Sequence, residues 1–417
     1  MALFERWYGR ILREKLKRPY VHILFGARQA GKSTLVKSLL PAGTLEINLA
    51  DPGRRSRYLA DPGELISECK SAPRTNKPHY VFIDEAQTVP AIFDAVQFLY
   101  DEDKTRWRFV LCGSSARKLR MTGANLLPGR SLIHHLYPLM LLERPAKEAA
   151  DNRQPVDFPL RLVWPRLGPK EKFPMDSLLV RLAYGELPGV VTSPHKDRAD
   201  ILKSYATVHL EEEIRREALV KDWGGFVRFL RLAAAESGQI LNYTSISQEA
   251  GVSQPTVKTY YQLLEDMFMG FSVPAYSKSP RKNLLSTPKF FFFDLGVRHA
   301  AAGFSPSTEA VMANPGSFFE QWVGIELWKR LRYSGEGSLF HQRSKDGAEV
   351  DFIVEHKHKL VPIEVKWTER PSLKDARHML KFLQEKRGQA IHGYLICRCP
   401  RPLRLHENIT ALPWFCL

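Results

Sequence analysis

The sequence has few cysteines and no long apolar segment. Five cysteines in 417 residues are too few for a disulfide framework, and we expect reduced thiols. Cys397 and Cys399 are separated by one residue, which is not the usual spacing of a zinc site. A metal cluster that also includes His392 and Cys416 is the alternative. No run of about 18 apolar residues occurs, so no helix is expected to span a bilayer.

The sequence also lacks a segment of the signal-peptide type. Residues 1–20 include several basic side chains, but no apolar stretch follows them. We therefore expect a cytoplasmic location without a membrane partner. The stretch reads as a surface helix that leads into the first strand, and a basic amphipathic helix lying on a membrane is the alternative.

Acidic residues are outnumbered by basic ones. Lys plus Arg number 61 and Asp plus Glu number 45, which gives a formal net charge of +16. This excess favours a polyanionic partner, either nucleic acid or an anionic membrane surface. The share of hydrophobic residues, 44%, excludes a mainly disordered chain. The length predicts about three domains.

A phosphate-binding motif lies between a predicted strand and a predicted helix. Residues 20–25 (YVHILF) have the composition of a buried strand, and residues 35–40 carry apolar side chains at helical spacing. The residues between them, GARQAGKST, fit G-x-x-x-x-G-K-[ST], in which Lys32 reaches the β- and γ-phosphates and Ser33 ligates Mg²⁺. The predicted nucleotide-binding residues are Gly26, Ala27, Arg28, Gln29, Ala30, Gly31, Lys32, Ser33 and Thr34.

Two further strand candidates end in residues suited to hydrolysis. Residues 80–83 precede Asp84 and Glu85, and an acid at the carboxyl end of a parallel strand faces the ligand crevice. We predict that Asp84 holds Mg²⁺ through water and that Glu85 polarises the attacking water. Residues 107–112 precede Ser114, which we predict to sense the γ-phosphate; a tight turn of small residues is the alternative.

Two arginines after these motifs are candidates for an arginine finger, which is an arginine that acts on the nucleotide of a neighbouring subunit. Arg130 follows a glycine turn, and Arg117 competes with it for that role. Solvated or DNA-facing arginines are the alternative interpretation of both.

The order of these motifs and the residues in them resemble those of the AAA-type (AAA+) P-loop ATPases of bacteria and archaea. The matching stretches are GARQAGKST, residues 47–66, FIDEAQ, LCGSSARKL and PGR. Within these ATPases, the chain is similar to a branch with a winged-helix module and a C-terminal restriction-endonuclease-like domain. The resemblance implies ATP and Mg²⁺ as cofactors and a homo-oligomeric ring, with a hexamer as the candidate. It also implies roles in binding and hydrolysis for Lys32, Ser33, Asp84, Glu85 and Ser114.

The middle of the chain predicts a lid and a DNA-binding module. Residues 143–173 do not match the family pattern and read as an insertion or linker, and residues 177–218 resemble the helical lid. Three predicted helices and two strands between residues 225 and 293 have the layout of a winged helix. A packing module is the alternative. The predicted DNA contacts are Gln254, Lys258, Thr259, Gln262, Lys278, Arg281 and Lys282.

The C-terminal part carries acids in a nuclease-like pattern. Residues 345–347 predict a hairpin turn, Asp351 lies in the strand after it, and Glu364 and Lys366 share one face of the next strand. This resembles the PD-(D/E)XK nucleases, with Glu320 as their helix-borne acid. The resemblance predicts Glu320, Asp351 and Glu364 as ligands of Mg²⁺ or Mn²⁺ and Lys366 as catalytic. An exposed Glu364–Lys366 ion pair is the alternative.

The sequence thus predicts an α/β protein of four parts. These are a P-loop AAA+ core (1–145), a linker and helical lid (146–222), a winged helix-turn-helix (223–303) and a nuclease-like α/β domain (304–417). We expect an ATPase that acts on DNA as a motor or remodeller, with DNA cleavage left open. The alternative is an ATP-dependent regulatory switch with a DNA-binding winged helix and an inactive, oligomerising nuclease-like domain.

Overall fold

The chain divides into two compact units. The first comprises residues 1–137 and 266–269, and the second comprises residues 138–265 and 270–417. The computed structural model describes residues 4–114, 127–150, 158–164, 172–210, 214, 220, 222–277, 279, 281, 286–343 and 349–417. Arg117, Lys278, Lys282 and the predicted turn at residues 345–347 lie outside these ranges.

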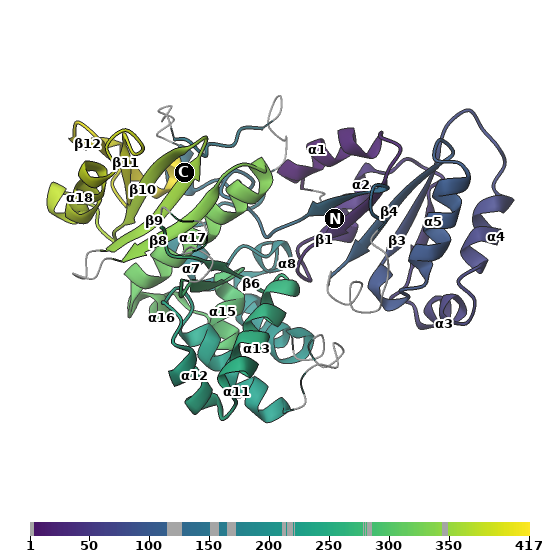
Figure 1. The fold of residues 1–417 in the computed structure, drawn as a ribbon, viewed down its shortest axis with the longest axis horizontal. Coiled ribbons are helices and arrows are strands. Elements are labelled where there is room, and N and C mark those ends of the chain that lie inside the picture. The colour runs from purple at the N-terminus through teal and green to yellow at the C-terminus, as the bar shows by residue number, and fades with distance from the viewer. Residues whose placement is uncertain are drawn as a thin grey trace. The chain divides into compact units, whose positions relative to one another are not determined.

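The first unit is a parallel sheet covered by helices (Figure 1). Its five strands follow the order β2-β3-β4-β1-β5, and every neighbouring pair is parallel. The three strands predicted from the sequence are present as β1 (Val21–Phe25), β3 (His79–Asp84) and β4 (Trp107–Gly113). The other elements are α1 (Trp7–Leu16), α2 (Lys32–Leu39), β2 (Leu45–Asn48), α3 (Pro52–Ala60), α4 (Glu64–Ser71), η1 (Ala86–Thr88), α5 (Ile92–Glu102) and β5 (Ser131–His135).

Strands β1 and β4 lie inside this sheet, and all of their residues are buried. Alternate side chains, such as Ile23 and Phe109, join a core with α3, α4 and α5. Burying one such side chain contributes roughly 1.5–3 kcal/mol. The strands therefore present their carboxyl ends as a rigid edge, and the loop after β1 starts from that edge.

A chain of buried polar contacts fastens α1 to the sheet. His22 of β1 donates from Nε2 to the Arg18 carbonyl (3.4 Å), which leaves its Nδ1 as an acceptor for His134 Nε2 of β5 (3.0 Å). His134 Nδ1 then accepts from the Tyr8 hydroxyl of α1 (2.8 Å). Both rings are neutral in this arrangement. Burial lowers the pKa of His22 to about 4 and that of His134 to about 3.

We expect acid to destabilise the protein through this histidine pair. Below pH 6.5 the histidines of the unfolded chain become protonated, while the buried ring of His134 in the folded protein stays neutral. The contribution of His134 to the free energy of unfolding is therefore fully present above pH 6.5 and is lost as the pH decreases toward 3. Between pH 6.5 and 5 the wild type should lose roughly 2 kcal/mol more than His134→Gln. Urea unfolding followed by circular dichroism measures this difference. The exposed His358→Gln is the control, and equal losses in wild type and His134→Gln would contradict the prediction.

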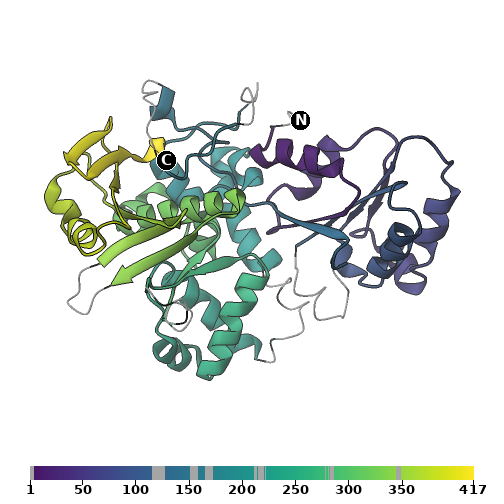
Figure 2. The ribbon, with the colours of Figure 1, turned by 45° about the horizontal axis from the view of Figure 1, so that its top comes forward.

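The second unit contains a mixed six-stranded sheet in the order β12-β13-β11-β10-β9-β8 and a separate antiparallel pair, β6-β7. Figure 2 shows its strands and helices from a second direction. Its strands are β6 (Gly270–Val273), β7 (Lys289–Phe292), β8 (Ser338–Arg343), β9 (Glu349–His356), β10 (Lys359–Val365), β11 (Gly393–Cys397), β12 (Leu403–His406) and β13 (Ile409–Pro413).

The helices of the second unit include the three predicted before the β6-β7 pair. These are α11 (Trp223–Ala235), α12 (Tyr243–Ala250) and α13 (Gln254–Asp266). The others are η2 (Lys147–Ala150), α7 (Leu178–Tyr184), α8 (Pro188–Val191), η3 (His195–Asp197), α9 (Arg198–Ser204), η4 (Tyr205–Leu210), α15 (Leu295–Ala301), α16 (Thr308–Met312), α17 (Pro315–Ser334), η5 (Leu373–Ala376), α18 (Arg377–Glu385) and η6 (Trp414–Cys416). Among the described residues no helix is long and apolar enough to cross a bilayer.

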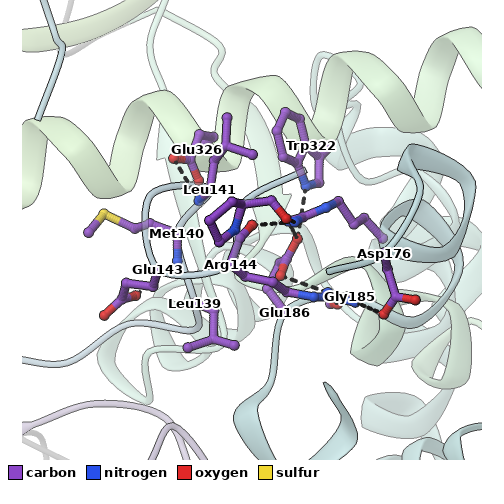
Figure 3. A network of polar contacts seen from close by, with 12 residues as sticks. Leu139, Met140, Leu141, Glu143, Arg144, Asp176, Gly185, Glu186, Trp322 and Glu326 are labelled. Atoms are coloured by element: carbon purple, nitrogen blue, oxygen red, sulfur yellow. Dashed lines mark hydrogen bonds and ion pairs between the residues drawn. The ribbon is translucent and has the colours of Figure 1, made fainter. Parts of the chain in front are cut away.

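The segment that reads as an insertion or linker begins with buried residues. Within residues 143–173, Glu143 and Arg144 are almost completely buried. Arg144 donates to Glu186 (2.9 Å) and also pairs with Asp176. Figure 3 shows these side chains converging beside α17. A charge-rich segment looks like a surface linker in sequence, but here its charges are neutralised by partners far along the chain.

Candidate nucleotide-binding site

The loop after β1 requires glycine at two positions. Gly26 has φ +155°, and a Cβ there would lie 2.2 Å from the Leu136 carbonyl oxygen. Gly31 has φ +90° and is the residue directly before α2. Both conformations are strained for other residues. The backbone therefore turns sharply into α2, whose first N–H groups have no partner within the helix and favour an anion.

Lys32 is the first residue of α2 and is only 7% exposed. Its Nζ donates to the carbonyl oxygens of Gly26 (2.7 Å) and Ala27 (3.0 Å). The ammonium group thus lies against the loop that the sequence predicts to surround phosphate. A phosphate oxygen would offer it a stronger, charge-assisted bond than these carbonyls.

The two residues predicted to hold Mg²⁺ contact each other. Asp84 ends β3, burial raises the pKa of its carboxyl, and a hydrogen bond from the Ser33 side chain opposes that shift. A hydroxyl and a carboxylate beside a phosphate loop are the oxygen ligands that Mg²⁺ prefers. The residues present therefore fit a nucleotide with its magnesium ion.

Gln87, for which no role was predicted from the sequence, forms hydrogen bonds to both Glu85 and Ser114. Gln87 is 6% exposed, and its Nε2 donates to Glu85 Oε2 (2.6 Å) and to Ser114 Oγ (3.2 Å). Its Oε1 is buried without a hydrogen-bond partner. A Cβ on Gly113 would lie 2.8 Å from this atom, so the backbone of β4 leaves room for it. Gln87 belongs to FIDEAQ, but only the short turn η1 brings it back toward Glu85.

The structure places the predicted arginine finger in an ion pair. Arg130 Nε donates to Asp101 Oδ1 of α5 (2.6 Å) at the surface. The finger role stays a prediction that requires this pair to open.

The polar side chains predicted to read DNA lie on the exposed face of α13, as expected. Gln254 donates to Thr244 Oγ1 (3.0 Å), and the Lys258 ammonium lies 5.2 Å from the centre of the Tyr243 ring. Val257 and Leu264, on the opposite face, are fully buried. Thr259, Gln262 and Arg281 are also exposed.

The C-terminal acids gather where the sequence predicted. The β9-β10 ladder pairs Phe352 with Ile363, so Asp351 and Glu364 are next in register. Lys366 Nζ lies 3.2 Å from Glu364 and 3.9 Å from Asp351. Glu364 is 3% exposed, whereas the Lys366 side chain is 41% exposed, so the ion pair is exposed only on the lysine side. Burial and the neighbouring Asp351 raise the pKa of Glu364 to about 9 and that of Glu320 to about 7.

The predicted second metal site is not shown. Within the described ranges no group of three or more His, Cys, Asp or Glu is arranged to hold a metal ion, and all five cysteines are free. The metal-ligand roles of Glu320, Asp351 and Glu364 stay predictions. Two members of this cluster, Lys289 and Glu349, were not predicted from the sequence; their charged groups lie 2.8 Å apart.

Comparisons with known families divide the chain into three matched segments. Residues 18–144 match a family described as an AAA domain. Residues 175–308 and 315–417 match families described as domains of unknown function, DUF8612 and DUF4143. Together with the loop geometry, the first match suggests a P-loop AAA-type ATPase, which uses ATP and Mg²⁺.

The relatives extend over most of the chain. An uncharacterised protein of Mycobacterium tuberculosis is 25% identical over 363 residues, which are 87% of this chain and 74% of the relative. A protein of Haemophilus influenzae is 26% identical over 83% of this chain and 82% of its own length. A solved DNA polymerase III gamma subunit-related protein of Thermotoga maritima is 11% identical over 62% of this chain and 97% of its own. Its TM-score of 0.25 is too low to support a conclusion.

Proposed function

We propose that this chain is an ATP-hydrolysing AAA-type protein that acts on DNA. The observation that carries the ATPase part is the set of side chains at the carboxyl edge of the parallel sheet. Lys32 lies on the loop carbonyls, Ser33 contacts Asp84, and Gln87 connects Glu85 to Ser114. A phosphate-binding loop, a magnesium-ligand pair and a carboxylate for water are the parts that phosphoryl transfer needs.

In this proposal each residue has one task. Lys32 and the N–H groups of the loop bind the β- and γ-phosphates, and Ser33 and Asp84 hold the magnesium ion. The bound ion neutralises charge on the phosphates. Glu85 accepts a hydrogen bond from the attacking water and polarises it, while Gln87 orients the Glu85 carboxylate through its 2.6 Å hydrogen bond. Ser114 Oγ accepts a hydrogen bond from the same Gln87 Nε2 (3.2 Å), and its task in this proposal is to sense the γ-phosphate.

The DNA part of the proposal is supported by charge and by exposed polar side chains. The chain has a net charge of +16, and α13 follows α12 after a short turn, with Gln254, Lys258 and Gln262 exposed. Such a helix is suited to contact DNA, with Arg281 on phosphate. We further propose a homo-oligomeric ring in which Arg130 leaves Asp101 to reach a neighbour's nucleotide.

DNA should change the ATPase rate and bind at low salt. We expect at least one of a duplex, a single strand and a branched junction to raise the steady-state rate. Lys258→Ala should weaken DNA binding. It should also reduce the slope of log affinity against log salt concentration by about one, because one phosphate contact is lost. Lys17→Ala, an exposed lysine of the first unit that pairs with Glu14, is the matched control. An unchanged rate with every DNA, together with no binding at low salt, would refute the DNA role.

A second candidate function is an ATP-dependent regulatory switch whose nuclease-like domain is inactive. The contacts of Lys289 and Lys366 favour it, because these lysines already pair with the acids of the C-terminal cluster. Slow turnover with tight nucleotide retention would support the switch, whereas steady turnover with strand movement would support a motor.

A further inference from the structure

A deeply buried lysine lies among the C-terminal acids. Lys289, the first residue of β7, is 4% exposed. Its Nζ lies 2.8 Å from Glu349 Oε1 and 3.0 Å from Glu320 Oε1. Lysine is almost never buried to this extent unless it is paired. Its two partners come from β9 and α17, so one ammonium group joins three elements.

The same cluster contains two more acids and one more lysine. Glu349 and Asp351 are two residues apart on β9 and therefore share a face. The charge of Asp351 acts on both Glu320 and Glu364. Lys366 Nζ lies 3.2 Å from Glu364 and 3.9 Å from Asp351. Four carboxyl groups are thus gathered around two ammonium groups.

One carboxyl oxygen of the cluster is buried without a hydrogen-bond partner. That atom is Oε1 of Glu364. His341, which is 2% exposed, interacts with Lys289 and Glu349 and with the backbone of Thr287. Buried unsatisfied groups are costly and need an explanation, such as a role in binding an ion.

We propose that this cluster is a cation site whose resident cation is the ammonium group of Lys289, and that a divalent cation binds there only when this group is removed. The ammonium group lies between Glu320 and Glu349 and neutralises their charge, so it occupies the position that a metal ion would need. Oxygen-rich, negatively charged clusters bind divalent cations according to their ligand charge, and Lys289 lowers that charge. The proposal does not depend on the ATPase function.

Manganese titration of the full chain tests the proposal. All proteins carry Asp84→Asn and contain no nucleotide, so that the P-loop contributes no site. We expect the wild-type cluster to bind no Mn²⁺ up to about 1 mM, and Lys289→Met to bind one ion at least about tenfold more tightly. Electron paramagnetic resonance of free Mn²⁺ gives the affinity. Lys289→Arg, which keeps a cation, should behave like the wild type.

Two further proteins make the result decisive. Lys289→Met leaves Glu320 and Glu349 unpaired, so Lys289→Met/Glu349→Gln is also measured, because it removes one positive and one negative charge and keeps three acids. It should also gain Mn²⁺ binding, and adding Glu364→Gln should abolish the gain. The proposal is overturned if neither Lys289 variant gains affinity. It is also overturned by a second result. In that result, the protein that keeps Lys289 binds Mn²⁺ as tightly as the Lys289 variants do, and Glu364→Gln in that same protein removes the binding.

Discussion

Glu85→Gln should bind ATP as tightly as the wild type and hydrolyse it at least about 100-fold more slowly. The carboxylate of Glu85 is the group that accepts the hydrogen bond from the attacking water, and an amide accepts it only weakly. The side-chain oxygen of the new glutamine would still accept from Gln87 Nε2, so the contact with η1 and Ser114 is kept. Fluorescent-nucleotide binding and single-turnover hydrolysis measure the two quantities separately.

Two further variants serve as controls for the Glu85→Gln result. Lys32→Ala removes the ammonium that lies on the Gly26 and Ala27 carbonyls and should abolish nucleotide binding itself. Asp94→Asn, an exposed residue of α5, should change neither binding nor hydrolysis. Wild-type hydrolysis in Glu85→Gln would show that another group activates the water.

Glu186→Ala should destabilise the second unit by about 3–5 kcal/mol, because it leaves buried cations without a counter-charge. Glu186 is 4% exposed and accepts hydrogen bonds from Arg144 (2.9 Å) and Arg181 (2.8 Å). Burial raises the pKa of its carboxyl, but the two guanidinium groups more than offset this effect and hold the pKa below the ordinary value. Figure 3 shows Trp322 of α17 directed at the same carboxylate.

Denaturant unfolding of wild type and variant measures this loss. Glu14→Ala breaks an ion pair with Lys17 in which both side chains are more than 60% exposed, and it should cost at most about 0.5 kcal/mol. A loss below about 1 kcal/mol in Glu186→Ala would show that water or another residue compensates the two arginines.

The prediction from sequence was best where a pattern is short and local. The strand before Gly26, the loop with Lys32 and the acid at the end of β3 were all located, because each depends on neighbours within a few residues. The buried face of α13 was located for the same reason, since helical spacing alone places Val257 and Leu264 together.

Prediction failed where charged residues pair across long distances in the chain. Arg144 read as part of a polar linker, yet its partner Glu186 is 42 residues away. Lys289 was not connected with Glu349, because nothing in the intervening residues places β7 beside α17 and β9.

The sequence by itself determined the phosphate-binding loop, the acids at the strand ends and the excess of positive charge. These depend on residue type and near-neighbour spacing, which set backbone geometry at Gly26 and Gly31. Only the tertiary structure decided which charges meet. It places Gln87 between Glu85 and Ser114, and Lys289 between Glu320 and Glu349. The physical reason is that burial makes an unpaired charge costly, and which group pairs with it depends on the packing of elements distant in sequence.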